Sequence, residues 1–346
     1  MSQKHLGIVI ILICLQLLSG CGKSVIPAPI PTPSFVQIPI PKTPLKPKSI
    51  IRLTVTDVTG TISTRNQVAV TWRDKSSSSQ DTDFYVGLLD IVDNKLRQSK
   101  PSIHFRYYSP SIVWSPDGTR LLLREDFNLT PYDILVFQID GTKEPHYLFR
   151  GECCGVDCDW SPDGRYIVCN RPLAAHGQPP NWEVQDTTTW QIICPATPWH
   201  TPCPPLRLAD GRWWHMGFWR TYTSESPEPT EPPQKQSIVS EVVPDAADQI
   251  CEEHFKSTGC MRFANSTKNW VAILSKPGLY VLDIERRQVL KIAETDSIVL
   301  NWSVDGRYLA WLEDGQVRVF DTANRAVTAY TVPGIVMLRI SWSPLQ

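Results

Sequence analysis

One short phrase occurs four times in this chain and sets its periodicity. The copies are Val113-Trp114-Ser115-Pro116-Asp117-Gly118, Asp159-Trp160-Ser161-Pro162-Asp163-Gly164, Asn301-Trp302-Ser303-Val304-Asp305-Gly306 and Ser341-Trp342-Ser343-Pro344. The tryptophans stand 46, 142 and 40 residues apart, and 142 is about three times 47. A unit of forty-odd residues predicts a β-propeller or a solenoid.

Each full copy of the phrase predicts a hairpin. Proline presets φ, aspartate bonds back to the backbone, and glycine takes the left-handed position of a tight turn between two strands. Weaker copies place six unit starts near residues 62, 114, 160, 207, 263 and 302. Further apolar strands are expected at 134–140, 182–186, 280–283, 288–292, 317–321 and 326–332. Four short antiparallel strands per unit is the pattern of a propeller blade.

The end of the chain suggests how the units close. Only Leu345 and Gln346 follow the last phrase, so a seventh unit would possess one strand, 335–342. The first unit offers three later strands, at 67–72, 84–91 and 96–105. We therefore predict an all-β domain, a six-bladed propeller of four-stranded antiparallel blades whose ring is closed by the C-terminal strand. The segment Ile51 to Val58 is either an extra edge strand or a competing first strand.

The phrase, followed by Arg165-Tyr166-Ile167-Val168 or Arg307-Tyr308-Leu309-Ala310, resembles the TolB-type, or WD-repeat-like, β-propeller repeat of bacterial proteins. The resemblance covers about residues 50 to 346. It implies a six-bladed scaffold and leaves the activity open, because one fold serves many functions.

The N-terminus predicts export and lipidation. Lys4 precedes an apolar run of 13 residues, 6–18, which suits a signal peptide and is too short to span a bilayer. Leu18-Ser19-Gly20-Cys21 follows and resembles the bacterial lipoprotein box, which implies acyl chains on Cys21. The alternative is an ordinary signal peptide with a chance cysteine. More than one acyl chain gives stable anchoring.

The domain boundaries follow from these signals. Residues 1–20 are the predicted signal peptide, 21–49 the lipidated cysteine with a Pro-rich linker, and 50–346 the propeller domain. Eight prolines between residues 27 and 47 predict an extended tether. A protein-recognition motif is the alternative reading of this segment. The expected location is extracytoplasmic, at a membrane or cell surface.

Eight cysteines remain after Cys14 and Cys21, and an even number in an exported chain indicates disulfides. Cys194 with Cys203 and Cys251 with Cys260 each bracket a short loop, and we expect both local pairs. Three pairings stay open for the other four, and a zinc cluster is their alternative use: Cys153, Cys154, Cys158 and Cys169.

Composition and motifs exclude several functions. The formal net charge of −1 with mixed signs gives no basis for nucleic-acid binding. The sequence contains no Gly-x-Ser-x-Gly elbow, phosphate-binding glycine loop or His-Glu-x-x-His motif, so we predict no enzyme, cofactor or metal site. The repeated aspartates Asp117, Asp163, Asp210 and Asp305 belong to hairpin turns and are expected to be structural.

Six of the 13 tryptophans lie between residues 182 and 219. Exposed rings in the region 182–222, such as Trp199 and Trp219, would suit stacking on sugars or a peptide, whereas packing between blades is the alternative. We interpret the chain as a monomeric, membrane-anchored binding or scaffold module for an unknown protein or glycan. A carbohydrate-binding or carbohydrate-active propeller is the rival interpretation.

Overall fold

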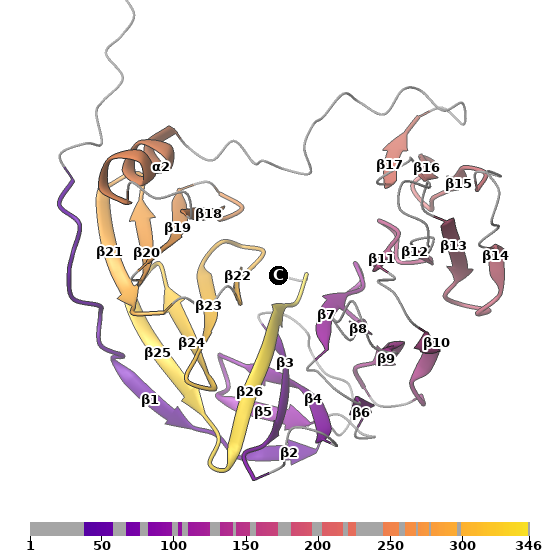
Figure 1. Ribbon diagram of the computed structural model, residues 1–346, viewed down its shortest axis with the longest axis horizontal. Coiled ribbons are helices and arrows are strands. Elements are labelled where there is room, and N and C mark those ends of the chain that lie inside the picture. The colour runs from indigo at the N-terminus through magenta and orange to yellow at the C-terminus, as the bar shows by residue number, and fades with distance from the viewer. Residues whose placement is uncertain are drawn as a thin grey trace, which may run out of the picture. The chain divides into compact units, whose positions relative to one another are not determined.

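The computed structural model describes residues 38–57, 67–76, 82–98, 103–105, 110–124, 132–140, 143–152, 157–171, 181–195, 203–216, 221–225, 245–255, 260–267, 269–276, 278–295 and 299–344. Residues 35–346 form one compact unit. Strands dominate it, and those described form six sheets (Figure 1).

Sheet 1 contains, in spatial order, β2 (Val55–Asp57), β5 (Lys95–Gln98), β4 (Thr82–Asp90), β3 (Gln67–Asp74) and β26 (Ile335–Trp342), with β6 (Ile103–Phe105) also pairing β4. Sheet 2 contains β10 (His146–Glu152), β9 (Tyr132–Gln138), β8 (Arg120–Arg124) and β7 (Ser111–Trp114). Sheet 3 contains β11 (Asp157–Trp160), β12 (Tyr166–Arg171), β13 (Asn181–Asp186) and β14 (Ile192–Cys194).

Sheet 4 contains β15 (Leu206–Arg207), β16 (Trp213–Met216) and β17 (Thr221–Ser224). Sheet 5 contains β18 (Met261–Ala264), β19 (Trp270–Ser275), β20 (Gly278–Asp283) and β21 (Gln288–Ala293). Sheet 6 contains β1 (Ser49–Arg52), β25 (Ala326–Thr331), β24 (Gln316–Asp321), β23 (Tyr308–Glu313) and β22 (Leu300–Trp302). Neighbouring strands in each sheet are antiparallel except where β1 meets β25 and β2 meets β5.

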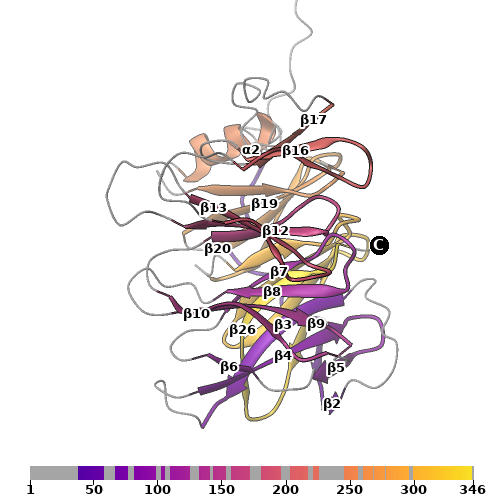
Figure 2. The ribbon, with the colours of Figure 1, turned by 90° about the vertical axis from the view of Figure 1, so that its right-hand side faces the viewer.

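The C-terminal strand completes the N-terminal sheet, as predicted. β26 pairs antiparallel with β3 from Ile335 opposite Asp74 to Trp342 opposite Val68 (Figures 1 and 2). Met337 and Trp342 are buried in the core between sheets 6 and 1. Each large apolar side chain removed from water in this way contributes about 1.5–3 kcal/mol, so the two ends of the domain are joined by packing as well as by hydrogen bonds.

Apolar clusters join the sheets in series. Sheet 5 packs on sheet 6, sheet 6 on sheet 1, sheet 1 on sheet 2, sheet 2 on sheet 3, and sheet 3 on sheet 4. Within the described ranges no apolar cluster joins sheet 4 to sheet 5. The closed six-bladed ring therefore stays a prediction, while the all-β class and the four-stranded antiparallel sheets are present.

A short helix covers the other face of sheet 5. It is α2 (Asp245–Ile250), continued by a π-helical turn, Cys251–Phe255. Ala247 and Ile250 pack on Val271 and Tyr280, and Figure 1 shows α2 beside β20 and β21. This helix was not predicted from the sequence, because it lies in the long insertion before β18 and carries no repeat signal.

The segment before residue 58 resolves into two edge strands instead of one. β1 adds to sheet 6 beside β25, and β2 adds to sheet 1 beside β5, both in parallel register. The packed region also begins before the predicted boundary at residue 50. Ile38 is buried against α2, and the Leu45 N–H donates to Lys291 O at 2.8 Å. Residues 38–49 of the predicted linker therefore lie against the sheets.

Two further expectations are corrected. The strand predicted over residues 96–105 is two strands, β5 and β6, which pair different parts of β4. The unit starting near residue 207 shows three strands within the described residues, not four. In both places the strand pattern alone does not indicate where pairing stops.

Candidate functional site

The repeated phrase forms the predicted turn. In the third copy Ser303 Oγ donates to Asp305 Oδ1 at 2.5 Å and accepts from the Tyr308 N–H at 2.8 Å. Gly306 has φ of 70°, a left-handed conformation that favours glycine. The first two copies repeat the serine–aspartate bond, Ser115 to Asp117 and Ser161 to Asp163.

The turn aspartates therefore serve the backbone, as predicted. Burial favours protonation of Asp117, but hydrogen bonds from Ser115 and Thr119 outweigh it and lower the pKa of the carboxyl. Asp210 bonds to the Arg212 backbone N–H and guanidinium. A carboxylate held by its own turn is not available as a general acid at neutral pH.

The tryptophan of the phrase links one sheet to the next. Its indole N–H donates to a backbone carbonyl of the neighbouring sheet in all four copies. The bonds are Trp114 to Ser341 O (3.0 Å), Trp160 to Val113 O (3.3 Å), Trp302 to Phe263 O (2.8 Å) and Trp342 to Asn301 O (2.8 Å). Sheets 5, 6, 1, 2 and 3 are joined by this one contact, so the repeat encodes the inter-sheet interface.

The described tryptophans of the region 182–222 are packing residues. Trp214 is almost fully buried between sheets 3 and 4, and Trp182 packs on the same cluster. Trp190 stacks on His146 with ring centroids 3.9 Å apart. Trp213 lies beneath the Arg207 guanidinium. Trp199 and Trp219, the predicted ligand surface, lie outside the described residues, and that prediction is not tested.

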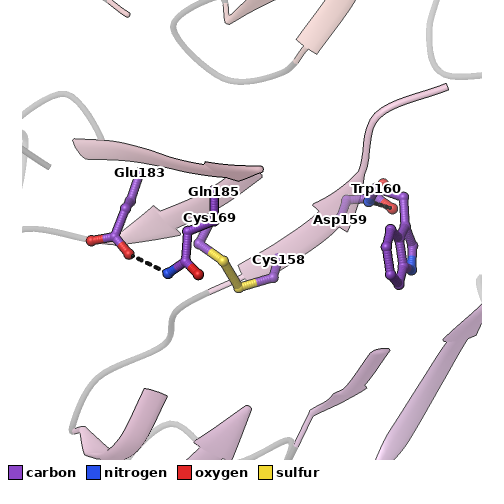
Figure 3. Close-up of a disulfide and its surroundings, with 6 residues drawn as sticks. All are labelled: Cys158, Asp159, Trp160, Cys169, Glu183 and Gln185. Atoms are coloured by element: carbon purple, nitrogen blue, oxygen red, sulfur yellow. Dashed lines mark hydrogen bonds between the residues drawn. A yellow bond between two sulfur atoms is a disulfide. The ribbon is translucent and has the colours of Figure 1, made fainter. Parts of the chain in front are cut away.

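A buried disulfide with polar neighbours lies between sheets 2 and 3 (Figure 3). Cys158 of β11 and Cys169 of β12 are directly opposite and form the bond. Glu183 and Gln185 on β13 lie on the same side of the sheet, and the Gln185 amide donates to Glu183 Oε1 at 3.0 Å. Because both sulfurs are bonded to each other, the zinc cluster considered for the four neighbouring cysteines is excluded.

The two local disulfides are those expected. Cys194 at the end of β14 pairs with Cys203, and Cys251 pairs with Cys260. Each closes a short loop, with a sequence separation of 9. Cys21, Cys153 and Cys154 lie outside the described residues.

Asp159 is the most unusual carboxyl group of the described part. Although Asp159 is exposed, neighbouring atoms partly desolvate its carboxyl group and raise its pKa, while the Trp160 N–H and the positive charge of Arg124 oppose that rise. Figure 3 places it on β11 beside Trp160. Four other aspartates shift the opposite way, namely Asp117, Asp186, Asp210 and Asp321. Asp159 can accept hydrogen bonds, but the structure does not place it in a described catalytic group.

The described residues contain no cluster of three or more histidine, cysteine or acidic side chains that could hold a metal ion. Among the same residues no helix is both long and apolar enough to cross a membrane.

No protein-family model matches this chain, and no curated protein matches it. Among solved structures it is similar to TolB from Acinetobacter baumannii, with 12% identity, a TM-score of 0.44, and coverage of 81% of this chain and 67% of that chain. A candidate 6-phosphogluconolactonase from Bacteroides uniformis has 12% identity, a TM-score of 0.33 and coverage of 77% and 82%. The tricorn protease has 13% identity, a TM-score of 0.33 and coverage of 79% of this chain and 30% of that chain. These similarities are distant. The description of the fold therefore rests on the strand pairing and packing of this chain itself.

Proposed function

We propose that this chain is a lipid-anchored, extracytoplasmic β-propeller that acts as a binding or scaffold module for an envelope or extracellular partner. The observation that carries the proposal is the series of sheets joined by repeated tryptophan bonds, which holds their loops and edges on one packed body. Three disulfides support an oxidising compartment. Recognition then falls to the loops and edges of the sheets.

Anchoring rests on Cys21 in the proposed lipoprotein box. Substitution of Cys21 by serine removes the acylated thiol, so the protein should lose palmitate labelling and leave the membrane fraction or persist as a precursor. Metabolic labelling of wild type and Cys21→Ser measures this directly. Equal labelling of the two proteins contradicts the anchor.

The class of partner is separable by one comparison. Binding to peptidoglycan and polysaccharide arrays is measured beside cross-linking to envelope proteins in intact cells, using wild type and the pair Trp199→Ala and Trp219→Ala. A protein scaffold should cross-link to a defined envelope protein and should not bind the peptidoglycan and polysaccharide arrays. Glycan binding that the pair abolishes without a change in melting temperature favours the carbohydrate-binding function instead.

A further inference from the structure

Charge is strongly segregated along this chain. Residues 1–56 contain six Lys or Arg and no acidic residue, and the first carboxylate of the sequence is Asp57. The remaining residues contain 28 Lys and Arg against 35 Asp and Glu, so their formal charge is −7. Such an asymmetry marks a segment that meets an anionic partner.

Four of these cations lie on one edge of the packed unit. Residues 42–52, here called the basic edge segment, include Lys42, Lys46, Lys48 and Arg52, all exposed. From Lys46 onward an exposed residue stands at every second position through Arg52, with Ile50 between Lys48 and Arg52, and Ser49 is exposed as well. An extended chain presents alternate residues on one side, so this row forms a single stripe.

The residues between the exposed ones attach the segment to the sheets. Leu45 packs on the core between sheets 5 and 6, and Leu53, immediately after the segment, is buried between sheets 6 and 1. The Lys48 N–H donates to Val327 O at 2.8 Å. The buried Lys291 ammonium donates to Lys42 O at 3.0 Å. The stripe is therefore held in place by a fixed backbone.

Ile50 adds an apolar group to the stripe. It is 67% exposed, the most exposed large apolar side chain of the described residues, and it stands on the outermost strand of sheet 6. Cations that flank an exposed apolar side chain are the pattern of surfaces that bind at the headgroup level of a bilayer.

We propose that the basic edge segment is a second membrane contact, which rests on an anionic phospholipid surface and orients the module. The inference deepens the proposed lipid anchoring, on which it rests for the position of the bilayer. The acidic remainder of the chain is repelled by an anionic surface, so attraction at one edge and repulsion elsewhere fix which edge faces the lipid.

The Glu294 carboxylate lies close to the segment. Glu294 pairs with the Lys291 ammonium at 3.0 Å, beside the Lys42 carbonyl. Its charge is offset by Lys291, which is not one of the four exposed cations. The stripe therefore keeps its positive charge.

Vesicle flotation tests the contact without the acyl anchor. The chain from residue 22 onward keeps the whole compact unit. It is mixed with vesicles of phosphatidylglycerol and phosphatidylcholine, or with vesicles of phosphatidylcholine alone. Each mixture is measured at about 0.05 M and about 0.5 M salt, because the electrostatic screening length falls about threefold between these concentrations. We expect binding to the anionic vesicles at low salt and its loss at high salt. Each cation contributes about fivefold near such a surface, so Lys42→Gln, Lys46→Gln, Lys48→Gln and Arg52→Gln together should lower the partition coefficient at least about a hundredfold.

A matched variant separates position from net charge. Lys75→Gln, Lys95→Gln, Lys143→Gln and Lys276→Gln remove the same charge from exposed positions outside the segment, and binding should be retained. Ile50→Ser should weaken binding to the anionic vesicles several-fold at low salt.

Equal binding to both vesicle types, or equal loss in the two four-site variants, overturns the proposal. Self-association of the first variant with unchanged vesicle binding also overturns it, because edge lysines then serve only to prevent strand addition. The protein used for flotation begins at residue 22 and therefore lacks Cys21. Its vesicle binding can be measured whether or not the separate palmitate-labelling experiment supports the lipid anchor.

Discussion

At the residue scale, the tryptophan of the repeat has two separate functions. Its ring fills the core between two sheets, and its indole N–H satisfies a carbonyl on the neighbouring strand. Trp302 shows both, since it packs with the cluster of sheets 5 and 6 and donates to Phe263 O at 2.8 Å. A carbonyl that loses its donor between sheets keeps the full cost of desolvation.

Trp302→Phe should therefore destabilise the domain by about 1–3 kcal/mol, because it keeps a ring and leaves the Phe263 carbonyl without its donor. Urea unfolding measures the loss as a lower midpoint with an unchanged slope. A change below about 0.3 kcal/mol would show that the indole hydrogen bond makes no net contribution.

His146 gives the domain a pH dependence. Burial lowers the pKa of this imidazole from 6.5, and its ring stacks on Trp190. Since the unfolded chain binds the proton more readily, the contribution of the neutral imidazole is present above pH 6.5 and is lost as pH falls through the lowered pKa.

His146→Phe keeps an aromatic ring and removes the proton site. Its urea midpoint should fall less than that of wild type as the pH falls below 6.5. Parallel midpoint curves for the two proteins across this range would exclude a contribution from His146.

At the element scale, the hairpin between β23 and β24 positions the closing strand. Asp314 and Gly315 both have positive φ, 53° and 72°, as a two-residue turn requires. The Met337 N–H of β26 donates to Gly315 O at 3.0 Å. A Cβ at Gly315 would meet Val336 Cγ1 at 3.0 Å, so this turn lies in contact with β26.

Gly315→Ala should destabilise the domain more than Gly334→Ala. Both positions have positive φ, which costs an L-residue about 1–2 kcal/mol. A Cβ at Gly334 meets nothing within 4 Å, so its variant measures the backbone cost alone. The difference between the two unfolding free energies reports the contact with β26, and equal losses would exclude strain at that contact.

The repeat accounts for the elements that were predicted. Hairpins at Asp117, Asp163 and Asp305 combine turn chemistry with alternating apolar strands, and the closing partner of β26 followed from the incomplete last unit. α2 was missed because its packing on sheet 5 is a long-range event in an insertion. The two parallel edge strands were undecided because their partners, β25 and β5, are far away in sequence.

The candidate site was less predictable than the fold. Loop length identified Cys194 with Cys203 and Cys251 with Cys260, whereas Cys158 had three open pairings until strand register placed it opposite Cys169. Residues 42–49 of the basic edge segment were predicted as part of a tether, because proline content alone does not show which residues lie against a sheet.

At the scale of the whole molecule, the sheets pack in series and disulfides close two short connections between them. Cys194–Cys203 closes the connection after β14, and Cys251–Cys260 holds the helical turn before β18. Loops of 9 to 11 residues predict a stabilisation of about 2–3 kcal/mol for each of the three bonds, largely through the unfolded chain. Such a molecule suits an oxidising compartment.

Protein isolated from its native compartment should therefore carry no reactive thiol at the six bonded positions: Cys158, Cys169, Cys194, Cys203, Cys251 and Cys260. Alkylation under non-reducing conditions, followed by peptide mass mapping, measures this. Unfolding the protein in denaturant before alkylation controls for burial, since a buried free thiol becomes reactive while a disulfide does not. Labelling at any of the six positions in denatured protein that has not been reduced would show that the bond is absent in the cell. That result would remove the support for an extracytoplasmic location.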